Sequence, residues 1–273
     1  MLDYLNKTLR NIRSLNELIP DVERLQDEVD ALRSRIDLGD ELFNLFQKEQ
    51  KLAAYQAVFS KAKPLVSVCV ATYNRASLLI ERSLRSILEQ DYTNLEIIVV
   101  GDCCTDNTEE LVSQIKDERL TFINLPQRGA YPADPHLRWM VAGTIPINHA
   151  LGLATGDFIT HLDDDDAYTL DRISRLVAFI QETRADLVWH PFLTENKDGR
   201  WNAYRATEYK RTQVTTSSVL YHSWFKRVPW DLQAYKYQEP GDWNRFRKFK
   251  YLNAKIARYP EPLLKHYRER NQS

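Results

Sequence analysis

The residues of this sequence with the clearest capacity for chemistry are four consecutive aspartates, Asp163 to Asp166. Four adjacent carboxylates repel one another and cannot be buried as bare anions. A hard divalent cation such as Mg2+ or Mn2+ removes that conflict, and it takes its remaining ligands from water and from the phosphates of a substrate. The run therefore predicts a metal site for a phosphorylated ligand, with a solvated acidic loop as the alternative.

Two predicted elements position the aspartates. The apolar segment 158–162, which includes β-branched residues, predicts a short buried strand, and residues 169–184 predict a helix. In open α/β sheets, ligands bind at the carboxyl ends of the strands. An acidic run between a strand and a helix is therefore more typical of a binding site than of an ordinary surface loop.

Polar residues follow two other predicted strands. Residues 65–71 lead into a turn that contains Tyr73, and residues 95–100 lead into a turn that contains Asp102. A tyrosine ring can stack on a nucleobase, and a carboxylate can accept a hydrogen bond from a base N–H. The alternative for such an aspartate is to cap the following helix. We expect the cap for Asp106 and the ligand role for Asp102.

Strands and helices alternate along most of the chain. Strands are predicted at 65–71, 95–100, 120–124, 158–162 and 186–192, and helices at 77–90, 107–116, 147–154 and 170–183. This alternation predicts an α/β fold of the Rossmann-like kind, with a mainly parallel sheet flanked by helices. Further along, the turn at 196–199 predicts a hairpin, 213–221 a strand and 242–251 a helix.

Composition excludes several classes of protein. The 273 residues carry 37 Lys and Arg against 38 Asp and Glu, so no overall basic charge suggests a nucleic-acid partner. No apolar run has the length of a membrane span, and the first residues lack the charge order of a signal peptide. The three cysteines lack zinc-ligand spacing and predict reduced thiols in a cytoplasmic protein. The basic, aromatic segment 243–250 leaves peripheral attachment at the inner membrane face open.

Residues 1–62 predict a helical extension that precedes a main domain at 63–273. We expect one helix from Pro20 to Gly39 and a second from about residue 41 to residue 60. Apolar residues of the first helix alternate in steps of three and four: Val22, Leu25, Val29, Leu32 and Ile36. This pattern is typical of a coiled coil, but it spans little more than two heptads. Two interpretations stay open, an oligomerisation element and a helical pair laid on the main domain.

Four segments carry a resemblance to a known family. They are Val-Ser-Val-Cys-Val-Ala-Thr-Tyr-Asn-Arg at 66–75, Leu-Glu-Ile-Ile-Val-Val-Gly-Asp-Cys-Cys-Thr-Asp-Asn-Thr at 95–108, Asn-His-Ala-Leu-Gly-Leu-Ala-Thr-Gly-Asp-Phe-Ile at 148–159 and Leu-Asp-Asp-Asp-Asp at 162–166. In order and spacing they resemble the successive motifs of family 2 glycosyltransferases with the GT-A fold. The resemblance covers about residues 64–250. It implies an inverting, hexosyl-type glycosyltransferase of glycan or polysaccharide biosynthesis, with a donor half at 63–166 and an acceptor half at 167–273.

The resemblance also implies a nucleotide-sugar donor, with UDP as the default and GDP or dTDP left open. The positions that it assigns to the donor nucleoside match Ala71, Thr72, Tyr73 and Asp102, and we count Arg75 of the same segment with them. The family's acidic motif holds the ribose and a divalent metal on the diphosphate. We place Mn2+ or Mg2+ on Asp165 and the ribose side on Asp163 or Asp164, in a run whose register is ambiguous by one.

A catalytic carboxylate is implied further along, in a Glu-Asp pair that opens a helix. Asp242 falls on the position of the family's base, and Gly241 replaces the acid that usually precedes it. Asp242 is therefore the favoured base and Glu239 the reserve. From its position alone, an aspartate at a helix start is most often a cap.

The segment 127–144 is longer than the corresponding part of the family, and long loops beside active sites are often functional. Arg128 or Arg138 could bind the diphosphate, with an ordinary surface position as the alternative. His161 lies inside a predicted strand, where we expect a structural role. His266 matches a terminal family motif only imperfectly, which makes a metal role the less favoured interpretation.

Two rival functions follow from the departures. A catalytically degenerate nucleotide-binding or scaffold module is supported by Gly241 and by Gly-Asp-Cys-Cys at 101–104, where the family commonly has Asp-Asp-Gly-Ser. A nucleotidyl or phosphoryl transferase would want a glycine-rich phosphate loop after the first strand, and residues 72–75 supply none. The acceptor is left open as a glycan, a lipid-linked sugar or a protein.

Overall fold

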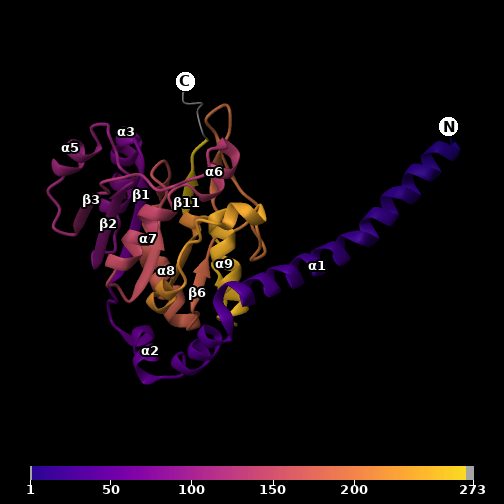
Figure 1. Ribbon diagram of the computed structural model, residues 1–273, viewed down its shortest axis with the longest axis horizontal. Helices are drawn as coiled ribbons and strands as arrows, with labels where there is room; N and C mark the ends of the chain where they lie inside the picture. Colours follow the sequence, from indigo (N-terminus) through magenta and orange to yellow (C-terminus); the bar gives the residue numbers. More distant parts are fainter. Residues whose placement is uncertain (1, 269–273) are drawn as a thin grey trace.

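The computed structural model describes residues 2–268, with side chains from residue 18 onward. A rounded α/β body carries a long N-terminal helix, α1 (Leu2–Glu49), that projects away from it (Figure 1). No helix in this part of the chain is long and apolar enough to cross a membrane.

Within residues 2–268, seven strands form the central sheet in the order β10-β6-β9-β4-β1-β2-β3. Their bounds are β1 Val66–Thr72, β2 Leu95–Gly101, β3 Leu120–Asn124, β4 Phe158–His161, β6 Leu187–Trp189, β9 Val219–His222 and β10 Ile256–Arg258. β1 pairs in parallel with β2 and β4, whereas β9 is antiparallel to β4 and β6. The inner strands β1 and β4 are buried almost throughout, as expected when helices cover a sheet on both faces. The predicted α/β fold with a mainly parallel sheet is confirmed.

The helices follow the strands in the predicted order. They are α3 Ala76–Leu78, the π-helical η2 Leu79–Leu84, α4 Arg85–Leu88, α5 Thr108–Ser113, α6 Pro135–Val141, α7 Thr144–Leu153, α8 Arg172–Thr183 and α9 Gly241–Tyr251, with the short η4 Ser223–Arg227 and η5 Ala234–Tyr237 between β9 and α9. In α8, the residues at helical spacing Ile173, Leu176 and Ile180 are buried, which shows why this segment folds as a helix against the sheet. The strand predicted at 213–221 is shorter, because a capping box of Thr215 and Ser218 closes the turn η3 (Thr216–Ser218) before β9.

A second, smaller sheet lies after the aspartates in the chain. Its strands are β5 Ala167–Tyr168, β7 Leu193–Glu195, β8 Trp201–Ala203 and β11 Leu264–His266, in the order β5-β11-β7-β8. β7 and β8 form the hairpin that the turn at 196–199 predicts. β11 pairs with β5, so the C-terminal part of the described chain returns to the segment that directly follows the acidic run.

The N-terminal extension differs from the prediction in two ways. The helix does not begin at Pro20 but runs through it, and its second part ends at Glu49, followed by α2 (Ala53–Ala57) and η1 (Val58–Ser60). Gly39 does interrupt the helix, with φ 70° and ψ 164°, a conformation that favours glycine. The rest of the extension packs on the body through residues such as Phe46 and Phe59, which are buried. The domain boundary at residues 62 and 63 stays a prediction.

Candidate active site

The carboxyl ends of β1, β2 and β4 meet at one edge of the central sheet. The backbone N–H of Asp102, after β2, donates to the carbonyl of Thr72 at the end of β1 (2.8 Å). The Thr72 hydroxyl in turn donates to Oδ2 of Asp164, after β4 (2.8 Å). The structure therefore brings together side chains that the sequence places after three separate strands.

Arg75 neutralises the part of the acidic run that faces β1. Its Nη1 lies 2.8 Å from Oδ2 of Asp165 and 3.2 Å from Oδ1 of Asp164. Ala71, the other donor position on β1, is half-buried beside the turn at Gly143, whose Cβ would lie 3.5 Å from that of Ala71. Arg75 thus joins the two strand ends through charge-assisted hydrogen bonds.

The outer aspartates point to other partners. Asp163 accepts a hydrogen bond from the Ser217 hydroxyl (3.0 Å), and Asp166 contacts Nδ1 of His266 (2.9 Å) and the N–H of Tyr267 (3.1 Å). Within the described residues, no group of three or more His, Cys, Asp or Glu side chains surrounds a common point at metal-ligand distance. Asp164 and Asp165 thus share Arg75 as a partner, whereas Asp163 and Asp166 bind Ser217 and His266.

The electrostatics of the run nevertheless fit a hard cation. Burial raises the pKa of Asp164 to about 6, and burial together with the charges of Asp166 and Asp165 raises the pKa of Asp163 well above its usual value. The hydrogen bond to Asp166 raises the pKa of His266 to about 9, so this imidazole carries a positive charge at neutral pH. A bound cation would offset the cost of holding these buried carboxylates ionised. An oxygen donor set of this kind suits Mg2+ or Mn2+.

A cluster of aromatic and charged side chains lies at the ends of β1 and β2. The ring of Tyr73 is 37% exposed, and the guanidinium carbon of Arg128 lies 3.5 Å from its centroid. Asp102 is only 2% exposed, lies 3.6 Å from Nε of Arg128 and accepts a hydrogen bond from the N–H of Gly129 (3.3 Å). Of the two arginines singled out in the long segment, Arg128 belongs to this cluster, whereas Arg138 donates to the carbonyl of Ala133 in its own segment.

Asp106 has the structural contacts expected of a capping residue. Its carboxylate accepts hydrogen bonds from the N–H and the hydroxyl of Thr108 at the start of α5, and from the N–H of Ala76 at the start of α3. These contacts fix the starts of α3 and α5 next to the Tyr73 cluster.

Asp242 lies in the first turn of α9 and is half-buried. Its Oδ1 accepts a hydrogen bond from the N–H of Trp243 (2.6 Å). Burial raises the pKa of Asp242 to about 6, against the lowering effects of that hydrogen bond and of the charge on Arg211. A carboxylate with a pKa just below neutrality is suited to accept a proton at physiological pH.

The neighbouring candidates have structural partners. Glu239 is 2% exposed and binds Arg33 of α1 (3.0 Å), Asn244 (2.8 Å) and Arg247 of α9 (3.1 Å). His161 is fully buried, its Nε2 lies 2.6 Å from the Tyr221 hydroxyl, and burial holds its pKa well below the usual value. Both side chains have structural roles. Of the two base candidates, Asp242 and Glu239, Asp242 is therefore the better one.

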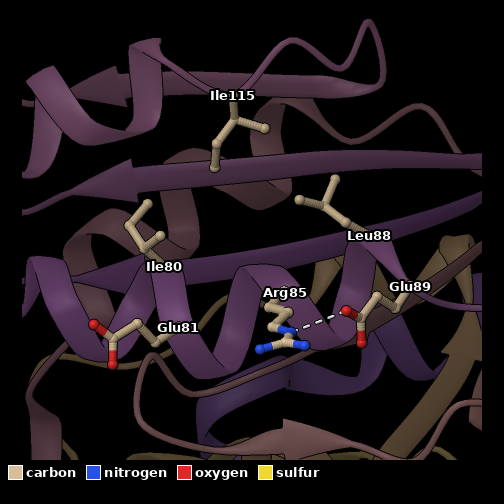
Figure 2. A pocket seen from close by; sticks show the side chains of 6 residues that line it. All are labelled: Ile80, Glu81, Arg85, Leu88, Glu89 and Ile115. Atoms are coloured by element: carbon tan, nitrogen blue, oxygen red, sulfur yellow. Dashed lines mark hydrogen bonds and ion pairs between the residues drawn. The ribbon is translucent and has the colours of Figure 1, made fainter.

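A hollow on the body surface is lined mainly by residues of η2 and α4 (Figure 2). It combines apolar side chains with the ion pair Arg85–Glu89 (Nε–Oε1 2.9 Å). Its lining residues are Ile80, Glu81, Arg85, Leu88, Glu89 and Ile115. Because none of the candidate site residues lines it, this hollow is not part of the site.

The sequence matches the model of one protein family. The model of glycosyl transferase family 2 matches residues 67–133 and 143–252, which is more than half of the chain. The chain belongs to glycosyl transferase family 2. The matched residues include the predicted donor positions, the acidic run and Asp242.

Curated relatives of this family 2 chain act in polysaccharide biosynthesis. It is 37% identical over 139 residues to the putative colanic acid biosynthesis glycosyl transferase WcaA of Escherichia coli K12, covering 50% of this chain and 43% of that protein. It is 26% identical over 221 residues to the hyaluronan synthase of Pasteurella multocida, covering 79% of this chain and 21% of that protein. The chain spans less than half the length of these relatives.

Solved structures share the fold. S. aureus TarS residues 1–349 in complex with UDP-GlcNAc superimposes with a TM-score of 0.59 at 23% identity, covering 76% of this chain and 59% of that one. The mannosyltransferase PcManGT of Pyrobaculum calidifontis, solved with GDP-Man and Mn2+, gives a TM-score of 0.55 at 17% identity, covering 88% of this chain and 68% of that one. These matches confirm the GT-A architecture that the sequence motifs imply.

The long segment at 127–144 distinguishes this glycosyltransferase from the family pattern. The part that the family model leaves unmatched, residues 134–142, contains α6. At Gly241, a Cβ atom would lie 3.3 Å from the carbonyl oxygen of Met140 in α6 and 3.5 Å from the Trp230 ring. A side chain at position 241 would therefore crowd α6 and the Trp230 ring, which pack against the start of α9.

Proposed function

We propose that this chain is a metal-dependent, inverting glycosyltransferase that moves a sugar from a nucleoside diphosphate sugar to an acceptor hydroxyl in polysaccharide biosynthesis. The observation that carries the proposal is the convergence of Tyr73, Asp102 and the acidic run at one sheet edge, in a chain whose family membership is shown. Ligands of α/β sheets bind at such an edge.

The donor nucleoside is proposed to bind at Tyr73, Asp102 and Arg128. The Tyr73 ring offers a face for the base, Asp102 offers an acceptor for a base N–H, and Arg128 lies against both. Thr72 fixes Asp164, which we place beside the ribose with Asp163. UDP is the proposed nucleotide, supported by the UDP-GlcNAc complex of TarS, while the GDP-Man complex of the mannosyltransferase supports the alternative.

Asp165 is the proposed metal ligand, with Mn2+ or Mg2+ as the ion. Its carboxylate is half-buried beside Arg75, and burial raises the pKa of Asp164 next to it, so a bound cation would offset the cost of keeping these carboxylates ionised. When bound, the ion would neutralise charge that develops on the leaving nucleoside diphosphate. Arg75 holds Asp164 and Asp165 together and keeps both carboxylates oriented at the sheet edge.

Asp242 is the proposed general base. The carboxylate would accept the proton of the acceptor hydroxyl as that oxygen attacks the anomeric carbon from the face opposite the leaving group, which inverts the configuration. The hydrogen bond from Trp243 fixes the orientation of Asp242, and its pKa of about 6 keeps most molecules ionised at pH 7.

Thermal denaturation with a panel of nucleotide sugars, each with and without Mn2+, tests the donor class. We expect UDP-sugars with Mn2+ to raise the melting temperature most, because a ligand that binds only the native state stabilises it. The release of UDP from the stabilising donor, with and without acceptor glycans, then tests catalysis. A chain that binds the donor but releases no UDP would be the degenerate module instead.

A further inference from the structure

Helix α1 carries an apolar face that no side chain in the described part of the protein covers. The face runs over the segment 18–36, and its residues are between 39% and 79% exposed: Leu18, Val22, Leu25, Val29, Leu32 and Ile36. In Figure 1 much of α1 projects away from the body. Contiguous exposed apolar surface of this kind marks a contact site for another molecule.

The identity of these residues specifies the kind of partner. In heptad notation Val22, Val29 and Ile36 occupy a positions, while Leu25 and Leu32 occupy d positions, with Leu18 one heptad earlier. β-branched residues at a combined with leucine at d favour a parallel, two-stranded coiled coil. Because the helix continues through Pro20, the pattern spans nearly three heptads rather than the two expected from the sequence.

The flanking charges fit a parallel pair of identical helices. In such a pair each g residue faces the e residue of the next heptad on the partner helix. Glu28 at g would face Arg33 at e, a contact between opposite charges, and Arg33 also binds Glu239 of its own chain (3.0 Å). The coil would end before residue 40, because Gly39 interrupts the helix.

The body occupies the other side of the helix. Asp30, Ser34 and Asp37 lie at b and f positions and bind α9: Asp30 accepts from Nε1 of Trp243 (3.0 Å), and Ser34 and Asp37 bind Arg247 (2.7 and 2.9 Å). The a and d positions point away from these contacts. A partner helix can therefore reach the apolar face without displacing α9.

We propose that residues 18–36 of α1 pair in register with the same residues of a second copy of this chain, as a parallel two-stranded coiled coil. Each copy would then hold its catalytic domain on the outer side of the coil, through the contacts between α1 and α9. The proposal concerns assembly and does not depend on the proposed transferase chemistry.

The mass of the full chain in solution, measured by sedimentation equilibrium over a wide range of concentrations, tests the pairing. We expect twice the 32.0 kDa of one chain. The double variant L25E/L32E places like charges in the seam and should weaken self-association by at least about a hundredfold. The control Ala31→Glu adds one carboxylate at an exposed c position of the same helix and should keep the dimer. A native chain that sediments as a single copy, or a double variant that stays dimeric, overturns the proposal.

Cross-linking tests the orientation. In a parallel pair in register, the two copies of residue 25 lie opposite each other, so Leu25→Cys should form a covalent dimer on mild oxidation. Ala31→Cys at the outer c position and the native chain, whose Cys103 is partly exposed, serve as controls. A dimer that forms no disulfide at residue 25 above these controls refutes the parallel arrangement.

Discussion

The Asp242→Asn substitution separates proton transfer from donor binding. Asparagine has the same shape, and its amide oxygen can still accept the hydrogen bond that Trp243 donates to Asp242 (2.6 Å). A positioned general base contributes roughly a factor of 10²–10⁴ to the rate. We therefore expect kcat for sugar transfer to fall by about that factor, while donor affinity measured by calorimetry stays nearly unchanged.

The same substitution should make the protein more stable above pH 6. Burial raises the pKa of Asp242 from 3.8 to about 6, so the folded state holds this proton more tightly than the unfolded chain. Stability is therefore lost as the pH rises from about 4 to about 6, by roughly 3 kcal/mol for a shift of this size. Asparagine does not ionise, so Asp242→Asn should denature at a higher temperature than the native protein at pH 8 and at a similar temperature at pH 4.

The pH dependence of kcat and the thermal stability of Asp242→Asn together test the role of Asp242. If Asp242 is the base, kcat of the native protein should rise with pH through about 6, with about a tenth of full activity at pH 5. Asp198→Asn is a suitable control, because Asp198 is exposed and Arg200 holds its pKa below the usual value. Loss of donor affinity in proportion to kcat would remove Asp242 from the base role. A destabilised variant at pH 8 would show that the burial argument is wrong.

Three further substitutions test the rest of the site. Arg128→Ala should weaken UDP binding about tenfold in calorimetry, since it removes the cation over Tyr73, whereas Arg138→Ala should leave binding unchanged. Asp165→Ala should abolish the increase in donor affinity that Mn2+ causes while leaving metal-free nucleotide binding intact; an unchanged Mn2+ effect would contradict the ligand assignment. Gly241→Ala should lower the free energy of unfolding by about 1 kcal/mol in urea titrations, because crowding of a backbone oxygen of α6 at 3.3 Å outweighs the gain of about 0.4–1 kcal/mol from a less flexible unfolded chain; no loss would mean that α6 adapts freely.

The sheet edge could be predicted because it depends on local signals and one general rule. Each strand reads as a short apolar segment, and parallel strands that alternate with helices must end at the same edge. The contacts among Thr72, Asp102 and Asp164 follow directly from that rule. The partners of Asp163 and Asp166 could not be predicted, since Ser217 and His266 lie more than fifty residues further along the chain.

The errors in the N-terminal extension have a similar cause. Proline is common in the first helical turn, so Pro20 was a reasonable place for a helix to begin. The helix nevertheless continues through it, which adds Leu18 to the apolar face. The position of Arg128 could not be predicted from the sequence either, because it depends on the path of a long loop rather than on a periodic pattern. Where a single residue decides a boundary or a loop decides a contact, sequence patterns carry little information.

Helix α1 contacts the body on one side and exposes an apolar face on the other. On one side it supplies Arg33 to Glu239 and Asp37 to Arg247, in a buried network that also fixes the start of α9. Removal of one member of such a network leaves a buried charge without its partner, which destabilises a protein by about 3–5 kcal/mol. The orientation of Asp242 in the first turn of α9 therefore depends on α1. If α1 also pairs with a second copy, the helix that organises the assembly is the same one that positions the proposed catalytic base.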